Sequence, residues 1–164
     1  MLLELARAEI RGGKKYPRIR GTVNFRQTNK GVLITSKIYN LPYEIGKCNK
    51  RVFGFHIHEG TECSGNNQDE FANAKAHYNP NNCAHPAHAG DMPSLFENKG
   101  YAYMTFLTDR FKLKDVIGKA VIIHSMPDDF TSQPSGNSGE KIACGIINKI
   151  FWYIAKLSKM NKIF

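Results

Sequence analysis

The most regular feature of the sequence is a series of short segments in which apolar and polar residues alternate. Residues 20–27 alternate in this way, residues 28–31 have the composition of a turn, and residues 32–39 are rich in β-branched side chains. A period of two is typical of a strand with one buried face, so these segments predict an antiparallel hairpin. Similar patterns predict strands over residues 51–58, 100–107, 119–124 and 141–147.

Two long polar stretches interrupt these strands. Residues 59–93 are dominated by Gly, Asn, Pro, Ala and Asp, and residues 127–140 are polar and rich in Gly and Ser. Loops of this length in a compact domain are usually functional or disordered. The whole pattern predicts an all-β fold, namely a Greek-key β-barrel or sandwich of the immunoglobulin-like class with two long functional loops.

The length of 164 residues allows one domain with a sizeable core, which we place at residues 1–150. Residues 151–164 form a C-terminal appendage whose apolar start fits an amphipathic helix or an extra strand. The sequence contains no run of about 18 apolar residues and no visible secretory signal, so we expect a cytoplasmic protein with no membrane partner.

The net charge of +9 leaves several functions open. A basic chain can bind nucleic acid or anionic lipid, and it can attract a small anion to a site. The lysines are dispersed, and no platform of basic and aromatic residues is evident in the sequence, so we expect no nucleic-acid partner.

The histidines indicate a metal site. His56 and His58 flank a single residue in a predicted strand, where positions i and i+2 face the same side. One histidine pair of this kind is weak evidence by itself, because two surface histidines on an edge strand would look the same. Imidazole suits both copper and zinc.

The first long loop adds a second group of candidate ligands. It contains His77, His85 and His88, followed by Asp91. Three histidines and one carboxylate can complete a tetrahedral zinc shell. His124 ends an apolar run and by itself would indicate only the end of a strand. All six histidines of the chain can therefore be interpreted as ligands of one two-metal site.

Several motifs in the correct order resemble copper/zinc superoxide dismutases. The resemblance extends from about residue 6 to residue 147. The matching segments are GTVNF at 21–25, GFHIHE at 54–59, AHYNP at 76–80, HAGD at 88–91, VIIH at 121–124 and GNSGEKIACG at 136–145.

The resemblance implies a role for each matching residue. Copper would be bound by His56, His58, His77 and His124, and zinc by His77, His85, His88 and Asp91, with His77 bridging the two metals. Asp128 matches the aspartate that tethers a copper ligand to a zinc ligand, here His56 and His85. Cys144 matches one half of the family disulfide, with Cys63 as the expected partner.

Three positions depart from the family pattern. Lys141 stands where the family usually has an arginine beside copper, which predicts retained but reduced activity because lysine lacks the planar fork of arginine. The interval between His85 and His88 is short, which leaves the ligands in place but raises the question of strain. The interval from Cys63 to His77 is long, so Cys83 remains a rival partner for Cys144, whereas Cys48 is expected to be a free thiol.

The resemblance implies dismutation of superoxide to oxygen and hydrogen peroxide, with copper alternating between Cu(II) and Cu(I). His77 would carry a proton to the product, and Lys141 would attract the anion. The rival interpretation is a dismutase-like protein that binds copper and zinc with little turnover. We also expect a homodimer that uses an apolar patch including Ile146 and Ile147, with a copper chaperone as a further candidate partner.

Overall fold

A computed structural model describes residues 5–46 and 52–150 of the chain. Within these residues, seven antiparallel strands form one sheet in the order β5-β8-β9-β1-β2-β3-β7. Its strands are β1 (Leu5–Gly12), β2 (Arg20–Thr28), β3 (Gly31–Tyr39), β5 (Phe55–His58), β7 (Tyr101–Thr108), β8 (Ala120–His124) and β9 (Lys141–Ile150). The short strands β4 (Val52–Phe53) and β6 (Leu95–Phe96) form a second sheet.

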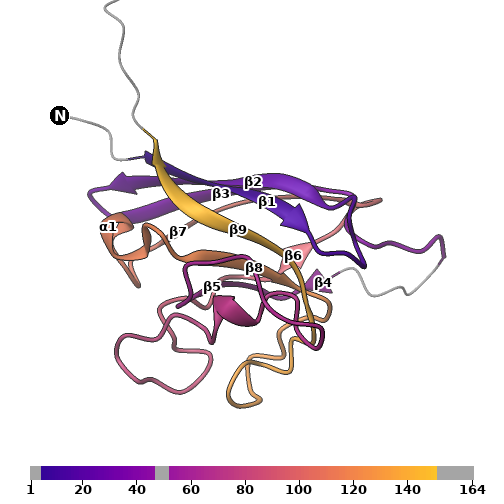
Figure 1. Cartoon of the computed structure of the whole chain (residues 1–164). Coiled ribbons are helices and arrows are strands. Elements are labelled where there is room, and N and C mark those ends of the chain that lie inside the picture. The colour runs from indigo at the N-terminus through magenta and orange to yellow at the C-terminus, as the bar shows by residue number, and fades with distance from the viewer. Residues whose placement is uncertain (1–4, 47–51, 151–164) are drawn as a thin grey trace, which may run out of the picture.

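The large sheet curls so that its two ends face each other. Figure 1 shows β1, β2 and β3 in an upper layer and β5 and β8 in a lower layer, with β9 passing between them. Strand β9 pairs with both β1 and β8, and β3 pairs with the distant β7. These pairings of non-consecutive strands confirm the predicted all-β barrel or sandwich class.

The core lies between the two layers. The inward residues of β2 and β3 are buried at alternate positions, as their sequence pattern predicts. Every residue of β5 and β8 is buried, because loops cover the outer face of this part of the sheet. The largest fully buried side chains include Phe25, Ile34, Phe55, Ile57 and Ile123.

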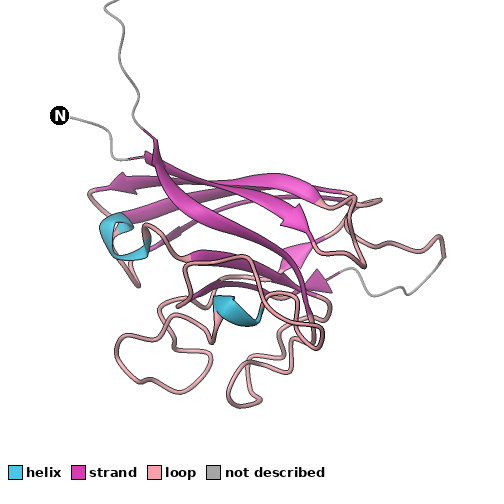
Figure 2. Cartoon of the chain, viewed as in Figure 1, coloured by secondary structure: helices cyan, strands magenta, loops and turns pink. Residues whose placement is uncertain are grey.

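The long loops gather on the outer side of the lower layer, away from β1, β2 and β3 (Figure 2). The loop after β5 contains the short 3-10 helix η1 (Ala72–Ala74). The one α-helical segment of the described ranges is α1 (Leu113–Val116), between β7 and β8. No helix among these residues is long and apolar enough to cross a membrane.

Two strands differ from the sequence prediction. Strand β1 was not predicted, because its inward positions include the small residues Ala6 and Ala8 and give little apolar contrast. The single strand predicted over residues 51–58 is divided at Gly54 into β4 and β5. A side chain at Gly54 would meet the side chain of Ser138 at 2.9 Å, so the second long loop approaches the backbone closely here.

The last strand corrects one part of the dimer prediction. Strand β9 continues to Ile150, and the side chain of Ile147 is fully buried in the core of the barrel. Ile147 therefore does not belong to an exposed patch, and only the partly buried Ile146 remains of that pair. The predicted appendage at residues 151–164 lies outside the described residues, as does Cys48.

Candidate metal centre

Two antiparallel strands and a loop bring four histidines together. His56 and His58 lie on β5, and His124 lies at the end of the adjacent β8. The Nε2 atoms of His58 and His124 are 3.2 Å apart. The ring centroid of His77, from the loop, lies 3.9 Å from that of His56 and 4.9 Å from that of His58.

Backbone hydrogen bonds fix the loop against β5. The N–H of Ile57 donates to the carbonyl of Gly90 at 2.9 Å, and the N–H of Tyr78 donates to the carbonyl of Ile57 at 2.8 Å. A Cβ at Gly90 would lie 2.2 Å from that carbonyl oxygen of Ile57, so only glycine permits this approach. Extended pairing thus places His77 beside His58 and Asp91 beside His56.

The candidate ligands form two groups that share His77. In each group the donor atoms lie within 4.8 Å of one another, and every residue is buried. The first group is His56, His58, His77 and His124, and the second is His77, His85, His88 and Asp91. The structure thus brings together all seven ligands that the sequence resemblance proposes, in the same two sets. The short interval between His85 and His88 does not separate the donors.

The donor atoms themselves fit two metal ions. Among the described side chains, His56 Nδ1, His77 Nε2, His85 Nδ1 and His88 Nδ1 are buried without a hydrogen-bond partner. Such atoms are costly in a folded protein unless another group satisfies them. The Nδ1 atoms of His85 and His88 lie 3.1 Å and 3.3 Å from Oδ2 of Asp91. Nitrogen donors with one converging carboxylate are the chemistry that copper and zinc prefer.

Hydrogen bonds select which ring nitrogen of each histidine is free. His58 Nδ1 donates to the carbonyl of Lys75 at 2.8 Å, and His124 Nδ1 lies 3.3 Å from the carbonyl of Gly139. These contacts leave the Nε2 atoms of His58 and His124 facing the first group.

Asp128 joins the two groups. Its Oδ2 accepts from Nε2 of His56 at 2.7 Å, and its Oδ1 accepts from Nε2 of His85 at 2.9 Å. Both rings therefore present Nδ1 toward the candidate metal positions. Burial raises the pKa of the Asp128 carboxyl, but the hydrogen bonds from His56, Phe130 and His85 outweigh it and lower the pKa to about 2.

Three histidines of the first group, namely His56, His58 and His124, are held in the neutral form that a metal ligand needs. Burial, with the charge of neighbouring histidines, lowers the pKa of His58 well below its usual value. Burial is also the main reason that the pKa of His124 is lowered to about 3. Burial likewise lowers the pKa of His56, although its hydrogen bond to Asp128 acts in the opposite direction. Neutral imidazoles accept a metal ion without first releasing a proton.

Comparison with known proteins agrees with this geometry. The sequence model of the family described as copper/zinc superoxide dismutase (SODC) matches residues 19–147. The protein named superoxide dismutase [Cu-Zn] 2 of Aquifex aeolicus is 37% identical over 142 residues, covering 77% of this chain and 78% of that protein. The superoxide dismutase [Cu-Zn] of Legionella pneumophila is 36% identical over 135 residues, with coverage of 77% and 76%.

The chain belongs to the copper/zinc superoxide dismutase family. A viral member, the superoxide dismutase [Cu-Zn] of Paramecium bursaria Chlorella virus 1, is 32% identical over 145 residues, covering 79% of this chain and 72% of that protein. The family resemblance deduced from the sequence motifs is therefore confirmed.

The family disulfide is present and joins Cys63 to Cys144, with their Cα atoms 5.6 Å apart. It fastens the start of the first long loop to β9. Cys83, the rival partner considered from the sequence, is a free and partly exposed thiol. The longer interval between Cys63 and His77 is accommodated by the turn and 3-10 helix that precede His77.

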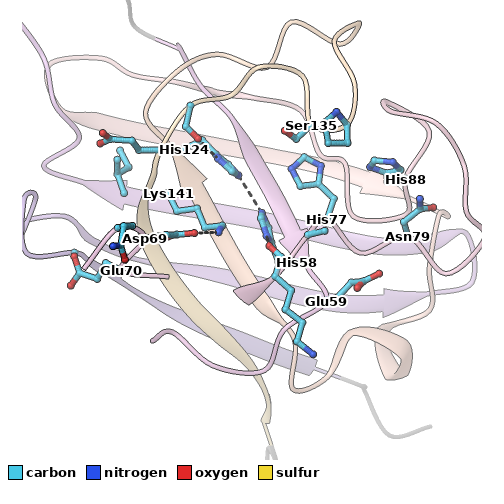
Figure 3. Close-up of a pocket in the computed structure, with 18 of the residues that line it drawn as sticks. His58, Glu59, Asp69, Glu70, His77, Asn79, His88, His124, Ser135 and Lys141 are labelled. Carbon is cyan, nitrogen blue, oxygen red and sulfur yellow. Dashed lines mark hydrogen bonds and ion pairs between the residues drawn. The ribbon is translucent and has the colours of Figure 1, made fainter. Parts of the chain in front are cut away.

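A cavity of about 770 Å³ opens onto the first histidine group of this dismutase-family chain. Figure 3 shows Lys141 beside His58 and His124. Lys141 is the residue that stands where the family usually has an arginine. Its ammonium is paired with the carboxylate of Asp69. No local sequence pattern predicts this partner, which lies 72 residues away along the chain.

Two further residues brace the loop that carries the zinc-type ligands, and neither was identified from sequence. Arg110 Nη1 donates to the carbonyls of Pro86, His88 and Asp91 at 2.9, 3.1 and 3.3 Å. The amide of Gln133 accepts from the N–H of His85 and donates to its carbonyl, at 3.0 and 2.7 Å. A single polar residue in a loop carries no sequence signal for such backbone contacts.

Proposed function

We propose that this protein is a superoxide dismutase that converts two superoxide anions and two protons into oxygen and hydrogen peroxide. The observation that carries this proposal is the pair of buried donor groups sharing His77, in a chain of the copper/zinc superoxide dismutase family. When bound, copper supplies one-electron oxidation and reduction, and zinc supplies a fixed positive charge without redox chemistry.

The first group is assigned to copper and the second to zinc. His56 would donate through Nδ1, and His58 and His124 through Nε2, which agrees with the hydrogen bonds on their other nitrogens. His85 and His88 would donate to zinc through Nδ1, with Asp91 as the carboxylate. Two metal types fit because only the second group contains an oxygen donor.

His77 is the residue that belongs to both groups. Its Nδ1 lies 2.8 Å from Oδ1 of Asp91, while its Nε2 is buried and has no hydrogen-bond partner among the described residues. We assign to Nε2 the task of holding a proton and delivering it to the reduced substrate. His77 lines the cavity that opens onto the first group, so its ring lies close to the space where a small anion would bind.

Lys141 is assigned to anion binding. Its side chain is only 16% exposed, and it lines the same cavity as His58, His77 and His124. A lysine offers a point charge rather than the planar fork of arginine, so orientation of the substrate is weaker. We therefore expect slower turnover than an arginine at this position would support.

One observation favours a second function, namely copper and zinc binding with little turnover. The ammonium of Lys141 is already paired with Asp69, which reduces the positive charge available to a substrate. This alternative predicts normal metal content and superoxide decay no faster than a copper-free control.

The experiment that tests the enzyme is rapid-mixing measurement of superoxide decay, on protein whose copper and zinc contents have been measured. We expect about one copper and one zinc per chain with fast decay. His124→Ala should lose copper and turnover but retain zinc, because His124 belongs only to the first group. Equal decay rates for the wild type and His124→Ala would refute the proposal of catalysis.

Assembly and location are separate proposals that rest on the sequence. We expect a homodimer in the cytoplasm and loading of copper by a chaperone, with neither nucleic acid nor a membrane as a partner. Light scattering of the purified protein tests the dimer. Expression in cells that lack the copper chaperone tests the route of loading, through the copper content of the recovered protein.

A further inference from the structure

The cavity at the copper-type histidines has no excess of positive charge over negative charge among its lysines and carboxylates. Its lining includes three lysines and four carboxylates, namely Lys15, Lys75, Lys141, Glu59, Asp69, Glu70 and Glu140. The net charge of +9 of the whole chain is therefore not concentrated where an anion must enter. Five exposed cations instead lie on the outer face of the upper layer: Arg7, Arg11, Arg20, Arg26 and Lys37.

The cations of the cavity differ in how strongly they act on the site. Lys15 pairs with Glu140 at 3.1 Å, but both side chains are about two-thirds exposed and their charges are well screened. Lys141 is largely buried and lies next to His124, so its charge acts through less water. Any group that opposes Lys141 therefore has a disproportionate effect on an incoming anion.

Asp69 is such a group, and the fold holds it in place. Its Oδ2 pairs with Lys141, while its Oδ1 accepts the N–H of Phe71 at 3.0 Å. Its own N–H donates to the side chain of Asn66 at 3.0 Å, and its carbonyl accepts from the N–H groups of Asn66 and Ala72. The carboxylate is thus part of an ordered turn rather than a mobile surface acid.

The same turn is also attached to the strand that carries Lys141. The disulfide links Cys63, six residues before Asp69, to Cys144, three residues after Lys141. Glu70 accepts the backbone N–H of Lys14 at 2.7 Å, which fastens the other end of the turn to the connection between β1 and β2. The Asp69–Lys141 pair is therefore held by covalent and backbone contacts on both sides.

We propose that Asp69 is the residue that limits anion binding at this site, because it offsets the charge of Lys141 at the cavity wall. This inference rests on the proposed dismutase function and adds a residue that sets the rate of that reaction. Removal of the carboxylate charge should strengthen attraction of a small anion. The summed field of a protein can change the encounter rate of a charged ligand by about 10- to 1000-fold. Asp69 supplies one charge of that field, so we expect its removal to change anion binding by about threefold.

The test uses azide as the anion and copper- and zinc-loaded protein of measured metal content. The dissociation constant of azide, followed by visible absorption of the bound copper, should fall about threefold in Asp69→Asn. It should rise by a similar factor in Lys141→Gln, in which Asp69 is unopposed. It should return close to the wild-type value in the double variant, in which a neutral pair replaces a pair of opposite charges.

Controls separate charge from structure. Asp69→Asn keeps an oxygen that can accept the N–H of Phe71. If the Asp69→Asn variant does not fold, Asp69→Ser replaces it, because the serine hydroxyl is a shorter acceptor for the same N–H. Asp69→Glu retains the negative charge, so its azide affinity should stay close to that of the wild type. Asp109→Asn removes one exposed carboxylate that does not line the cavity, and should leave azide affinity unchanged.

Unchanged or weakened azide binding in Asp69→Asn, with normal metal content, would overturn the inference. Weakened binding would mean that Asp69 positions Lys141 for the anion rather than opposing it. The test also stands apart from the dismutase proposal, because azide affinity is measured without turnover. If azide affinity follows the predicted pattern but superoxide decays no faster with the metal-loaded wild type than with a copper-free control, the inference on anion binding survives and the proposed function fails.

Discussion

Asp128→Asn should weaken copper binding much more than zinc binding. The reason lies in the orientation that the introduced amide must adopt. Oδ1 of Asp128 accepts both the N–H of Phe130 at 2.7 Å and Nε2 of His85 at 2.9 Å, so the amide oxygen is favoured at that position. The amide NH₂ group then replaces Oδ2 and faces Nε2 of His56, which is 2.7 Å away in the native protein.

Two donors would then face each other on the copper side. His56 can relieve the conflict by moving its proton from Nε2 to Nδ1, but Nδ1 is the atom assigned to copper. Loss of a hydrogen-bond partner of this kind typically costs about 10- to 100-fold in metal affinity, or about 1.4–2.7 kcal/mol. We expect that loss for copper and a much smaller one for zinc, because the hydrogen bond to His85 is retained.

Competition titration against a chelator measures both affinities. Asp109→Asn is the matched control, because it makes the same chemical change at an exposed residue outside both ligand groups. Equal losses for the two metals would contradict the orientation argument. A larger loss for zinc than for copper would mean that the amide is reversed and that the contact from Phe130 does not control it.

Three further results are expected. In the metal-free protein, burial lowers the pKa values of His58 and His124. The free energy of unfolding should therefore be constant above the unfolded-state pKa of about 6.5 and should fall below it by about 1.4 kcal/mol per pH unit for each of the two residues. Denaturant titrations from pH 8 to 4 measure this dependence, and a flat profile would count against neutral buried histidines. Cys63→Ser opens a covalent loop with a sequence separation of 81 and should cost about 4.5 kcal/mol in urea unfolding, whereas a cost near zero would mean that the bridge adds nothing to stability. Gly136→Ala places a Cβ on a residue with φ +66° and within 1.9 Å of Oδ1 of Asp128. The substitution should lower the free energy of unfolding by about 1–3 kcal/mol and reduce metal affinity. Normal zinc and copper affinity would contradict this packing.

The sequence was most informative where a short-range pattern determines the structure. Strands β2 and β3 follow from alternation and an intervening turn, and the two candidate ligand groups follow from motifs in family order. Strand β1 was missed because Ala6 and Ala8 face the core without the apolar contrast that larger residues would give. Tertiary packing, rather than local pattern, makes that segment a strand.

The remaining differences concern contacts between distant segments. The pairing of Asp69 with Lys141 and the contacts of Arg110 with the zinc-type loop depend on how the loops return to the barrel, which no local pattern encodes. The burial of Ile147 depends on the register of β9 against β8 and β1. A register change of one residue would reverse the side that this residue faces, so an apolar residue in a strand does not by itself predict an exposed patch.

We propose that one buried centre holds copper and zinc in separate groups joined by His77. Anomalous diffraction at the copper and zinc absorption edges, on crystals of protein loaded with both metals, tests it most directly. We expect one copper signal among His56, His58, His77 and His124, and one zinc signal among His77, His85, His88 and Asp91. Both metals at one position, or either metal away from His77, would contradict it.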